Sequence, residues 1–377
     1  NVFAVMTAWL FPLIHHGRVW VVYWILPYPN QGNLWPHFQS PLVFDVPAVS
    51  TYLTVSLLFR YTGMIPDLAV VRDRSTGVRR KSYGFFIPNW SNTSQQWRHH
   101  GAAYLFFAAL ATPLVVSVHS VVSWDFAFPV VPGRHSTIFA PYSVAGAIHS
   151  GLAMVITLFI PLRRIYRVEH FITVHILEQL AKTLLPTGLI VGYAYVVEFF
   201  YGVVSGSATE YDLFLWRAFG NYRVTFWIMV LCNTVLPSVF FFKKAVPASV
   251  AFSVSLAVNV GMWFERYVVI CSSPGRELDP YPWDVLRAVY APTWVEYGNP
   301  GGLFSMFFFL FLLFVKFLPS VSMTEMEELL PPPPAGRGAG IAVKTGTSPG
   351  RNRLFLQSSP LQAPIRGWYG LLARSFE

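Results

Sequence analysis

Long apolar runs make up most of the chain, and short polar or charged stretches separate them. A helix that crosses a bilayer needs roughly 20 apolar residues, and about eight runs approach or exceed this length. They cover residues 2–26, 41–64, 100–123, 141–165, 176–204, 224–242, 247–271 and 302–318. The pattern predicts an all-α, polytopic transmembrane protein.

Composition supports this interpretation. Hydrophobic residues make up 54% of the chain and charged residues only 12%, where a soluble domain has about 25%. The 27 Lys and Arg exceed the 18 Asp and Glu, which could indicate nucleic acid. The basic residues, however, lie in short loops between apolar runs, where they orient helices in the membrane. We therefore expect the basic residues to lie next to a lipid bilayer, and we expect no nucleic-acid partner.

The loop charges predict an orientation. Basic residues gather after the second, fourth and sixth runs, so these loops are predicted to be cytoplasmic. The opposite loops contain acids and aromatic residues typical of an interfacial belt, namely Trp35, Trp124, Trp283 and Trp294. Residues 273–301 are accordingly expected outside.

Three ionisable residues, His15, Asp45 and Arg266, interrupt apolar runs. The predicted orientation places Asp45 and Arg266 towards the outer face and His15 close to the middle of the membrane. An ionisable residue at such a position is a functional hypothesis by default. All three could face one cavity that opens outward. The alternative is that His15 and Asp45 bond to each other or to Arg18 and only lock two helices.

Other ionisable candidates within or beside the runs are His119, Asp125, His149, Lys182, Glu198 and Glu265. Glu198 has apolar and aromatic neighbours on both sides. With His119 or His149 it could relay protons, as carboxylates and imidazoles do in pumps. It could equally be a neutral acid bonded to a tyrosine. Cys232 and Cys271 have no metal-ligand spacing, and no histidine pair is singled out for haem, so we expect no bound metal.

Several separate strings resemble the NrfD-like family, the membrane subunits of polysulfide reductase type. Within it the chain is most similar to the membrane subunit of alternative complex III, a bacterial quinol-oxidising respiratory complex. The strings include Leu10-Phe-Pro-Leu-Ile-His15-His-Gly-Arg18, Ser40-Pro-Leu-Val-Phe-Asp45-Val, Ser117-Val-His119-Ser-Val-Val-Ser-Trp-Asp125 and Asn259-Val-Gly-Met-Trp-Phe-Glu265-Arg266. The likeness extends to about residue 328.

The resemblance implies ten helices in two four-helix bundles, with one peripheral helix at each end. About eight runs are present and the sequence starts inside one, so we expect an N-terminal truncation. The implied domains are a first bundle at 1–135 that lacks its N-terminal helices, a second bundle at 136–275, and an outer loop with a peripheral last helix at 276–330. Residues 331–377 are rich in Gly, Pro, Ser and Arg and are predicted to be a disordered basic tail.

The resemblance also implies a function: oxidation of a quinol such as menaquinol in the bacterial inner (cytoplasmic) membrane. The chain would hold no covalently bound cofactor. Iron-sulfur clusters and haems would belong to partners, namely an iron-sulfur subunit on the outer face, a homologous NrfD-like membrane subunit and a multihaem cytochrome c. Carried over, the quinol site is His15, Asp45 and Arg266, with His15 and Asp45 catalytic, and the proton path is His119, Asp125 and Glu198.

These residue types suit the reaction. A quinol that loses two electrons releases two protons, which an imidazole and a carboxylate can accept, and an arginine can donate to a quinone carbonyl. Whether further protons are translocated stays open. Two other interpretations also stay open: a secondary transporter, which shares helical bundles and midplane charges, and a passive membrane anchor for redox subunits.

Overall fold

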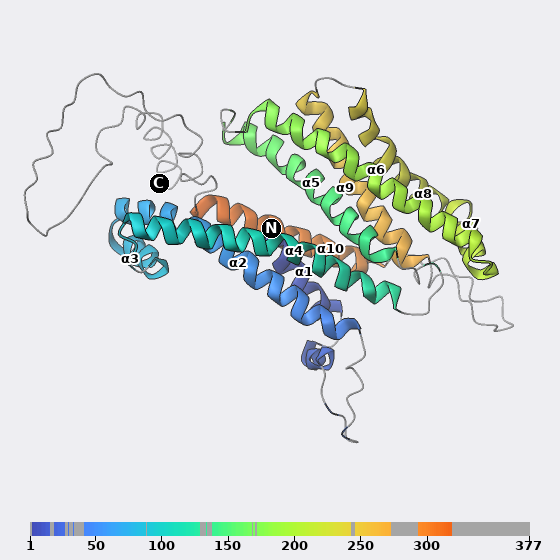
Figure 1. Ribbon diagram of the computed structural model, residues 1–377, viewed down its shortest axis with the longest axis horizontal. Coiled ribbons are helices and arrows are strands. Elements are labelled where there is room, and N and C mark those ends of the chain that lie inside the picture. The colour runs from blue at the N-terminus through green and yellow to red at the C-terminus, as the bar shows by residue number, and fades with distance from the viewer. Residues whose placement is uncertain are drawn as a thin grey trace, which may run out of the picture. The chain divides into compact units, whose positions relative to one another are not determined.

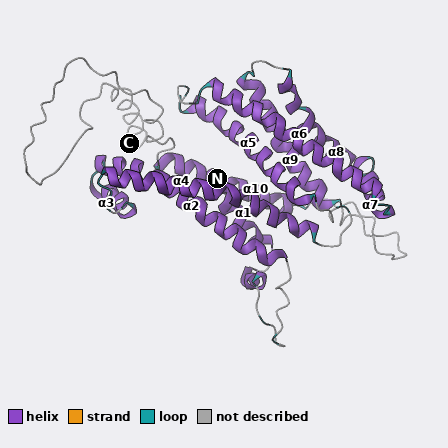
Figure 2. Ribbon diagram, viewed as in Figure 1, coloured by secondary structure: helices purple, strands orange, loops and turns teal. Residues whose placement is uncertain are grey.

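A computed structural model describes the chain over most of its helical part. Figure 2 shows that every regular element in the described part is a helix. The described residues are 2–15, 19–26, 29, 33, 41–87, 89–128, 133, 138–167, 169, 172–242, 246–272 and 293–318.

Within these ranges, seven helical segments are long and apolar enough to cross a membrane. Six are single helices: α2 (Pro41–Arg74), α4 (Ser94–Ala127), α5 (Phe139–Ile165), α6 (Val174–Val204), α9 (Ala248–Cys271) and α10 (Trp294–Phe317). The seventh joins α8 (Arg223–Val230), the π-helical η2 (Leu231–Val235) and the 3₁₀-helical η3 (Pro237–Phe241). The predicted all-α, polytopic membrane fold is confirmed.

The first predicted crossing differs from the prediction. In place of one helix over residues 2–26, the structure describes α1 (Val2–His15) and a separate 3₁₀ helix, η1 (Val19–Ile25). The 14 residues of α1 extend about 21 Å, less than the roughly 30 Å of a hydrocarbon core. Two further short helices, α3 (Gly77–Phe86) and α7 (Ala208–Ala218), lie between the crossings.

The crossings pack in two groups that meet along one pair of helices (Figure 1). In the first group, α2 packs against α4 and α1, and α1 also packs against α10. In the second, α5 packs against α6 and α9, while α8 and η2 also pack on α9. The two groups are joined where α4 packs against α5.

Small and polar side chains hold the second group together. Thr157 of α5 lies 3.0 Å from the hydroxyl of Ser255 and accepts a 3.0 Å hydrogen bond from the Asn259 amide, both on α9. Lipid tails are as apolar as leucine, so helices in a membrane associate through close packing and such bonds more than through hydrophobic burial.

The π-helical turn η2 places Asn233 between neighbouring helices, where it is fully buried. Pro237 has no backbone N–H and so cannot bond to the carbonyl of Asn233, four residues earlier. Gly188 on α6 and Gly261 on α9 allow this turn to approach closely, because a Cβ on either would meet atoms of Asn233. The crossing depends on these two glycines.

Gly261→Ala should destabilise the protein by about 1–3 kcal/mol, because the added methyl would overlap Asn233 and Cys232 in a packed interior. Thermal unfolding of the detergent-solubilised protein measures the change. Gly151→Ala is the matched control, since a Cβ there meets nothing within 4 Å. Equal melting temperatures for the two variants would contradict this account of η2.

Candidate functional site

The helix ends that carry the predicted site residues lie at one end of the first group. The ring of Phe314 contacts both Phe3 at the start of α1 and the guanidinium of Arg60 on α2. Along α1, His15 lies about 18 Å beyond Phe3, and along α2, Asp45 lies about 22 Å before Arg60. Both residues therefore reach the same end, which the loop charges predict to face outside and which we call the outer end. The side chain of His15 lies outside the described part of the structure.

Asp45 and Asp125 form a carboxyl pair at the outer end. Asp45 lies near the start of α2 and Asp125 near the end of α4, and their carboxyl groups are within hydrogen-bonding reach of each other. The Oδ1 atom of each is buried and receives no hydrogen bond from the described residues. Two ionised carboxylates this close repel each other, so the pair suits one shared proton.

Arg266 interacts with residues other than Asp45 in the described structure. Its Nη2 lies 3.8 Å from Oε1 of Glu265, the preceding residue on α9. Its charge is also near enough to act on the imidazole of His119 on α4. Its Nη2 also lies beside Gly146 of α5, at ordinary contact distance, 3.5 Å, from where a Cβ on that residue would be. Arg266 thus lies beside α5 and connects α9 with α4 electrostatically.

Glu265 is the most deeply buried acid of the second group, with none of its surface exposed. Its Oε2 accepts a 2.5 Å hydrogen bond from the hydroxyl of Tyr195, which in turn accepts one from the Asn233 amide at 2.8 Å. Its Oε1 and the nearby hydroxyl of Tyr142 are both buried, and neither has a hydrogen bond of good geometry among the described residues. The described residues thus supply only part of the hydrogen bonding that this carboxylate needs.

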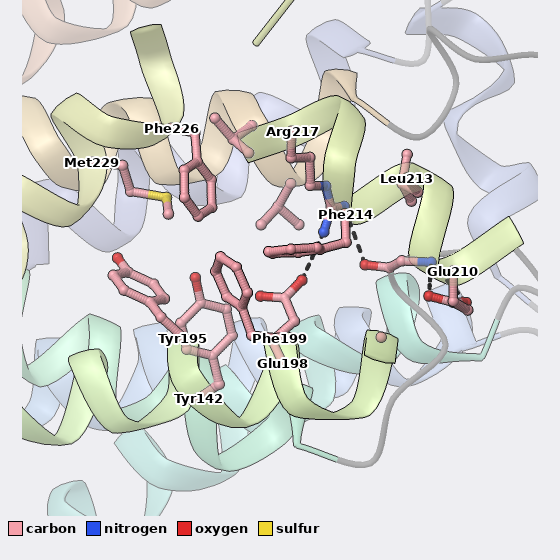
Figure 3. A pocket seen from close by; sticks show the side chains of 14 residues that line it. Tyr142, Tyr195, Glu198, Phe199, Glu210, Leu213, Phe214, Arg217, Phe226 and Met229 are labelled. Atoms are coloured by element: carbon pink, nitrogen blue, oxygen red, sulfur yellow. Dashed lines mark hydrogen bonds and ion pairs between the residues drawn. The ribbon is translucent and has the colours of Figure 1, made fainter. Parts of the chain in front are cut away.

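Glu198 pairs with Arg217, as Figure 3 shows. Nη1 of Arg217 lies 2.7 Å from Oε1 of Glu198, Nε donates to the hydroxyl of Ser272 at 2.7 Å, and Nη2 donates to the carbonyl of Gly133 at 3.2 Å. The amide of Gly133 then donates to the carboxylate of Glu210 at 2.9 Å. Arg217 therefore ties together α6, α7, the end of α9 and the segment before α5.

A cavity of about 40 Å³ lies between the tyrosines near Glu265 and the Glu198–Arg217 ion pair. Its wall includes Tyr142, Tyr195, Glu198 and Arg217, which Figure 3 shows together with Phe199. A water molecule needs roughly 10–15 Å³ of such space and two or more polar partners, so the cavity can hold a few waters. Water here would be close to the hydroxyl of Tyr142, which is part of the cavity wall.

The structure thus relates the predicted site residues in ways that the sequence did not indicate. Asp45 faces Asp125, and Arg266 lies near His119. The shared cavity of His15, Asp45 and Arg266 stays a prediction. Glu198 belongs to an ion pair, which is neither the free relay nor the tyrosine-bonded acid that we considered. His149, left off the candidate site, is fully buried, and its Nδ1 lies 2.9 Å from the Thr187 hydroxyl.

Sequence reasoning missed Arg217, Tyr195 and Asn233 as members of this network. Arg217 lies between two apolar runs, where the sequence alone does not distinguish a buried cation from a loop cation. Tyrosine and asparagine carry no formal charge. Placing them inside a membrane helix costs less free energy than placing an ion there, so the sequence did not indicate them as functional candidates. One sequence feature could have indicated Tyr195. It lies three residues before the acid Glu198, so the two side chains are on neighbouring parts of the same helix surface.

Buried acids, histidines and arginines at the outer ends of packed transmembrane helices define an integral membrane protein with a polar site inside its helix bundles. The sequence model of the polysulphide reductase family NrfD matches residues 1–274. The chain belongs to this family, whose members are multi-pass membrane subunits of quinol-linked redox complexes and usually partner iron-sulfur subunits. Among curated proteins, none matches the chain.

Arg217→Met should destabilise the protein by about 3 kcal/mol, because it leaves the largely buried carboxylate of Glu198 without its cation. Unfolding in detergent, followed by helical circular dichroism, measures this loss. Adding Glu198→Gln should restore part of it, since the second change removes the unpaired charge. Arg223→Met, at an exposed position, is the control and should have little effect. A double variant no more stable than Arg217→Met would argue against the pair.

Proposed function

We propose that the chain is the quinol-oxidising membrane subunit of a respiratory complex and that the quinol ring binds at the outer end, beside the Asp45–Asp125 pair. The observation that carries the proposal is this carboxyl pair, whose buried Oδ1 atoms lack donors among the described residues. The hydroxyl groups of a quinol are donors of the required kind. His15 ends α1 at the same end of the first group.

In the proposed reaction a quinol becomes a quinone, with loss of two electrons and two protons. One proton goes to an imidazole, that of His15, whose unperturbed pKa of about 6.5 suits a base at neutral pH. The other goes to the carboxyl pair and from there to the external water. The two electrons pass to an iron-sulfur cluster of a partner subunit. Arg266 and His119, which lie near each other, would donate to the developing quinone carbonyl.

A more specific assignment follows from the resemblance of the sequence. We propose an alternative complex III-like assembly in the bacterial inner membrane that uses a quinol such as menaquinol. Its partners would be an iron-sulfur subunit on the outer face, a homologous membrane subunit and a multihaem cytochrome c. This chain itself would hold no prosthetic group. Glu198 would serve proton movement only indirectly, since Arg217 already neutralises it.

Asp125→Asn and Asp45→Asn should each lower kcat for quinol oxidation by about 10²- to 10⁴-fold, the usual contribution of a general base. Either change leaves one carboxyl facing an amide, so the pair loses a proton acceptor. Steady-state oxidation of quinol by the complete complex in native membranes measures the effect. His15→Ala should act in the same direction.

Asp73→Asn is the matched control, because Asp73 is an exposed acid at the opposite end of α2. Unchanged quinol oxidation in Asp45→Asn and Asp125→Asn would favour a passive anchor for redox subunits. Solute transport by the chain alone in liposomes would favour a secondary transporter, whereas a quinol subunit depends on its iron-sulfur partner.

A further inference from the structure

The short helix α3 exposes large apolar side chains although its 10 residues are too few to cross a membrane. Val78 is 80% exposed and Phe85 is 81% exposed. Lys81 is exposed between them, and spacings of three and four residues put all three side chains on one face of the helix. Such a face is unfavourable in water, because apolar surface is favoured in an apolar environment. The face therefore suits an occupant that is apolar and also accepts a cation.

The contacts of α3 place its C-terminal end level with the end of a transmembrane helix. The hydroxyl of Tyr83 donates to the carbonyl of Phe317, the last residue of α10, at 3.2 Å. Ile87, directly after α3, belongs to a buried cluster with Leu68 of α2, and Trp90 packs against this cluster. Tryptophan is enriched where the hydrocarbon of a membrane meets the headgroups. The C-terminal end of α3 thus lies at the membrane surface, on the side that the loop charges predict to be cytoplasmic.

Figure 1 shows α3 beside the end of α2, along which it turns back. The hydroxyl of Tyr61, well before the end of α2, donates to the carbonyl of Phe86 at 2.5 Å, whereas α3 starts at Gly77, just after α2 ends. Phe85 therefore lies nearer to the membrane than Lys81, which precedes it along the helix by about 6 Å. The headgroup layer on each side of the hydrocarbon is about 5–8 Å thick. With Phe85 at the hydrocarbon boundary, Lys81 lies among the headgroups.

The charge around α3 is strongly positive. Residues 70–98 contain six Lys and Arg and one acid, Asp73. This acid lies 3.0 Å from Nε of Arg72 on its own helix. Arg80 and Lys81 follow each other in α3, and both are exposed. Anionic lipids of a cytoplasmic leaflet attract such residues, and each Lys or Arg near the surface raises the binding constant about fivefold.

We propose that α3 binds anionic phospholipids of the cytoplasmic leaflet through Arg80, Lys81 and Phe85. The two cations contact the phosphate groups, and the phenyl ring lies among the first carbons of the acyl chains. An acidic segment of a protein would also satisfy the cations, but it would leave Phe85 without an apolar environment. A phospholipid supplies both parts. Through the contacts of α3 with α2 and α10, the bound lipid holds the cytoplasmic ends of these two helices at the membrane surface.

Removing the two cations should abolish most of the preference for an anionic lipid. The full-length protein in neutral detergent is titrated with fluorescent phosphatidylglycerol, and fluorescent phosphatidylcholine is the reference. Arg80→Gln/Lys81→Gln should weaken phosphatidylglycerol binding about 25-fold, fivefold for each charge, and leave phosphatidylcholine binding unchanged. The preference of the unaltered protein should also fall as salt is added, because ions screen exposed charges.

Arg164→Gln/Arg167→Gln is the matched control. It removes the same charge from exposed positions at the end of α5, on the same predicted side of the membrane. Phosphatidylglycerol binding should change less than twofold. An equal loss in the two double variants would overturn the assignment to α3, because it would show a general effect of surface charge. Full retention of the preference in Arg80→Gln/Lys81→Gln would overturn it as well.

Phe85→Ser tests whether the occupant is a lipid. The change removes no charge, yet it should weaken phosphatidylglycerol binding about fivefold, because the lipid loses an apolar contact. Phe128→Ser, at an exposed position at the opposite end of α4, is the control and should have no effect. Glycerol phosphate at millimolar concentration, which has the phosphate without acyl chains, should not displace the lipid. Displacement by glycerol phosphate, or unchanged binding in Phe85→Ser, would indicate a site for soluble anions or acidic protein segments and overturn the proposal.

The altered positions of α3 are exposed, so the variants should keep the helical circular dichroism and melting temperature of the unaltered protein in neutral detergent. A loss of lipid binding then reports on the surface and not on folding. The inference is independent of quinol chemistry. Asp45→Asn, at the opposite end of α2, should bind phosphatidylglycerol as the unaltered protein does.

Discussion

The cost of keeping charge inside an apolar environment constrains this structure more than any other single factor. Transfer of an unpaired ion out of water costs several kcal/mol even after relaxation, so each buried acid needs a cation, donors or a proton. The protein uses a different solution for each. Glu198 has Arg217, Glu265 has Tyr195 and the more distant Arg266, and Asp45 has, among the described residues, a second acid, Asp125. A fixed cation or tyrosine stabilises a permanent arrangement, whereas the acid pair requires a proton that can leave. The pair is therefore the better place for chemistry.

Arg266 links the two groups of helices electrostatically. It lies beside α5, close to Gly146. The arginine interacts with Glu265 in its own group and acts on His119 in the other. A charge in this position is sensed on both sides of the contact between α4 and α5. Any change of protonation near His119 would therefore also affect the hydrogen-bonded acid and tyrosines of the second group.

The sequence predicted the transmembrane helices well because a run of about 20 apolar residues has few alternatives in a membrane. It also identified Asp45, Asp125, Glu198 and Arg266 as costly residues, since each is ionisable within or at the end of an apolar run. The partners could not be predicted. The Asp45–Asp125 pair arises from contact between α2 and α4, which no local sequence pattern predicts. Which helix faces which is decided by packing, and a single sequence does not encode this in any local pattern. The domain boundaries stay a prediction.

The arrangement of polar and apolar surfaces limits the kind of molecule that suits the outer end. The acid pair offers acceptors and Arg266 offers a donor, while the helices that carry them present apolar side chains to the bilayer. A simple lipid chain would leave the buried carboxyl oxygens without donors from its own groups. A molecule with hydroxyl groups on a flat head supplies these donors, and an aliphatic tail is compatible with the surrounding lipid. These chemical demands agree with the proposed quinol independently of family membership.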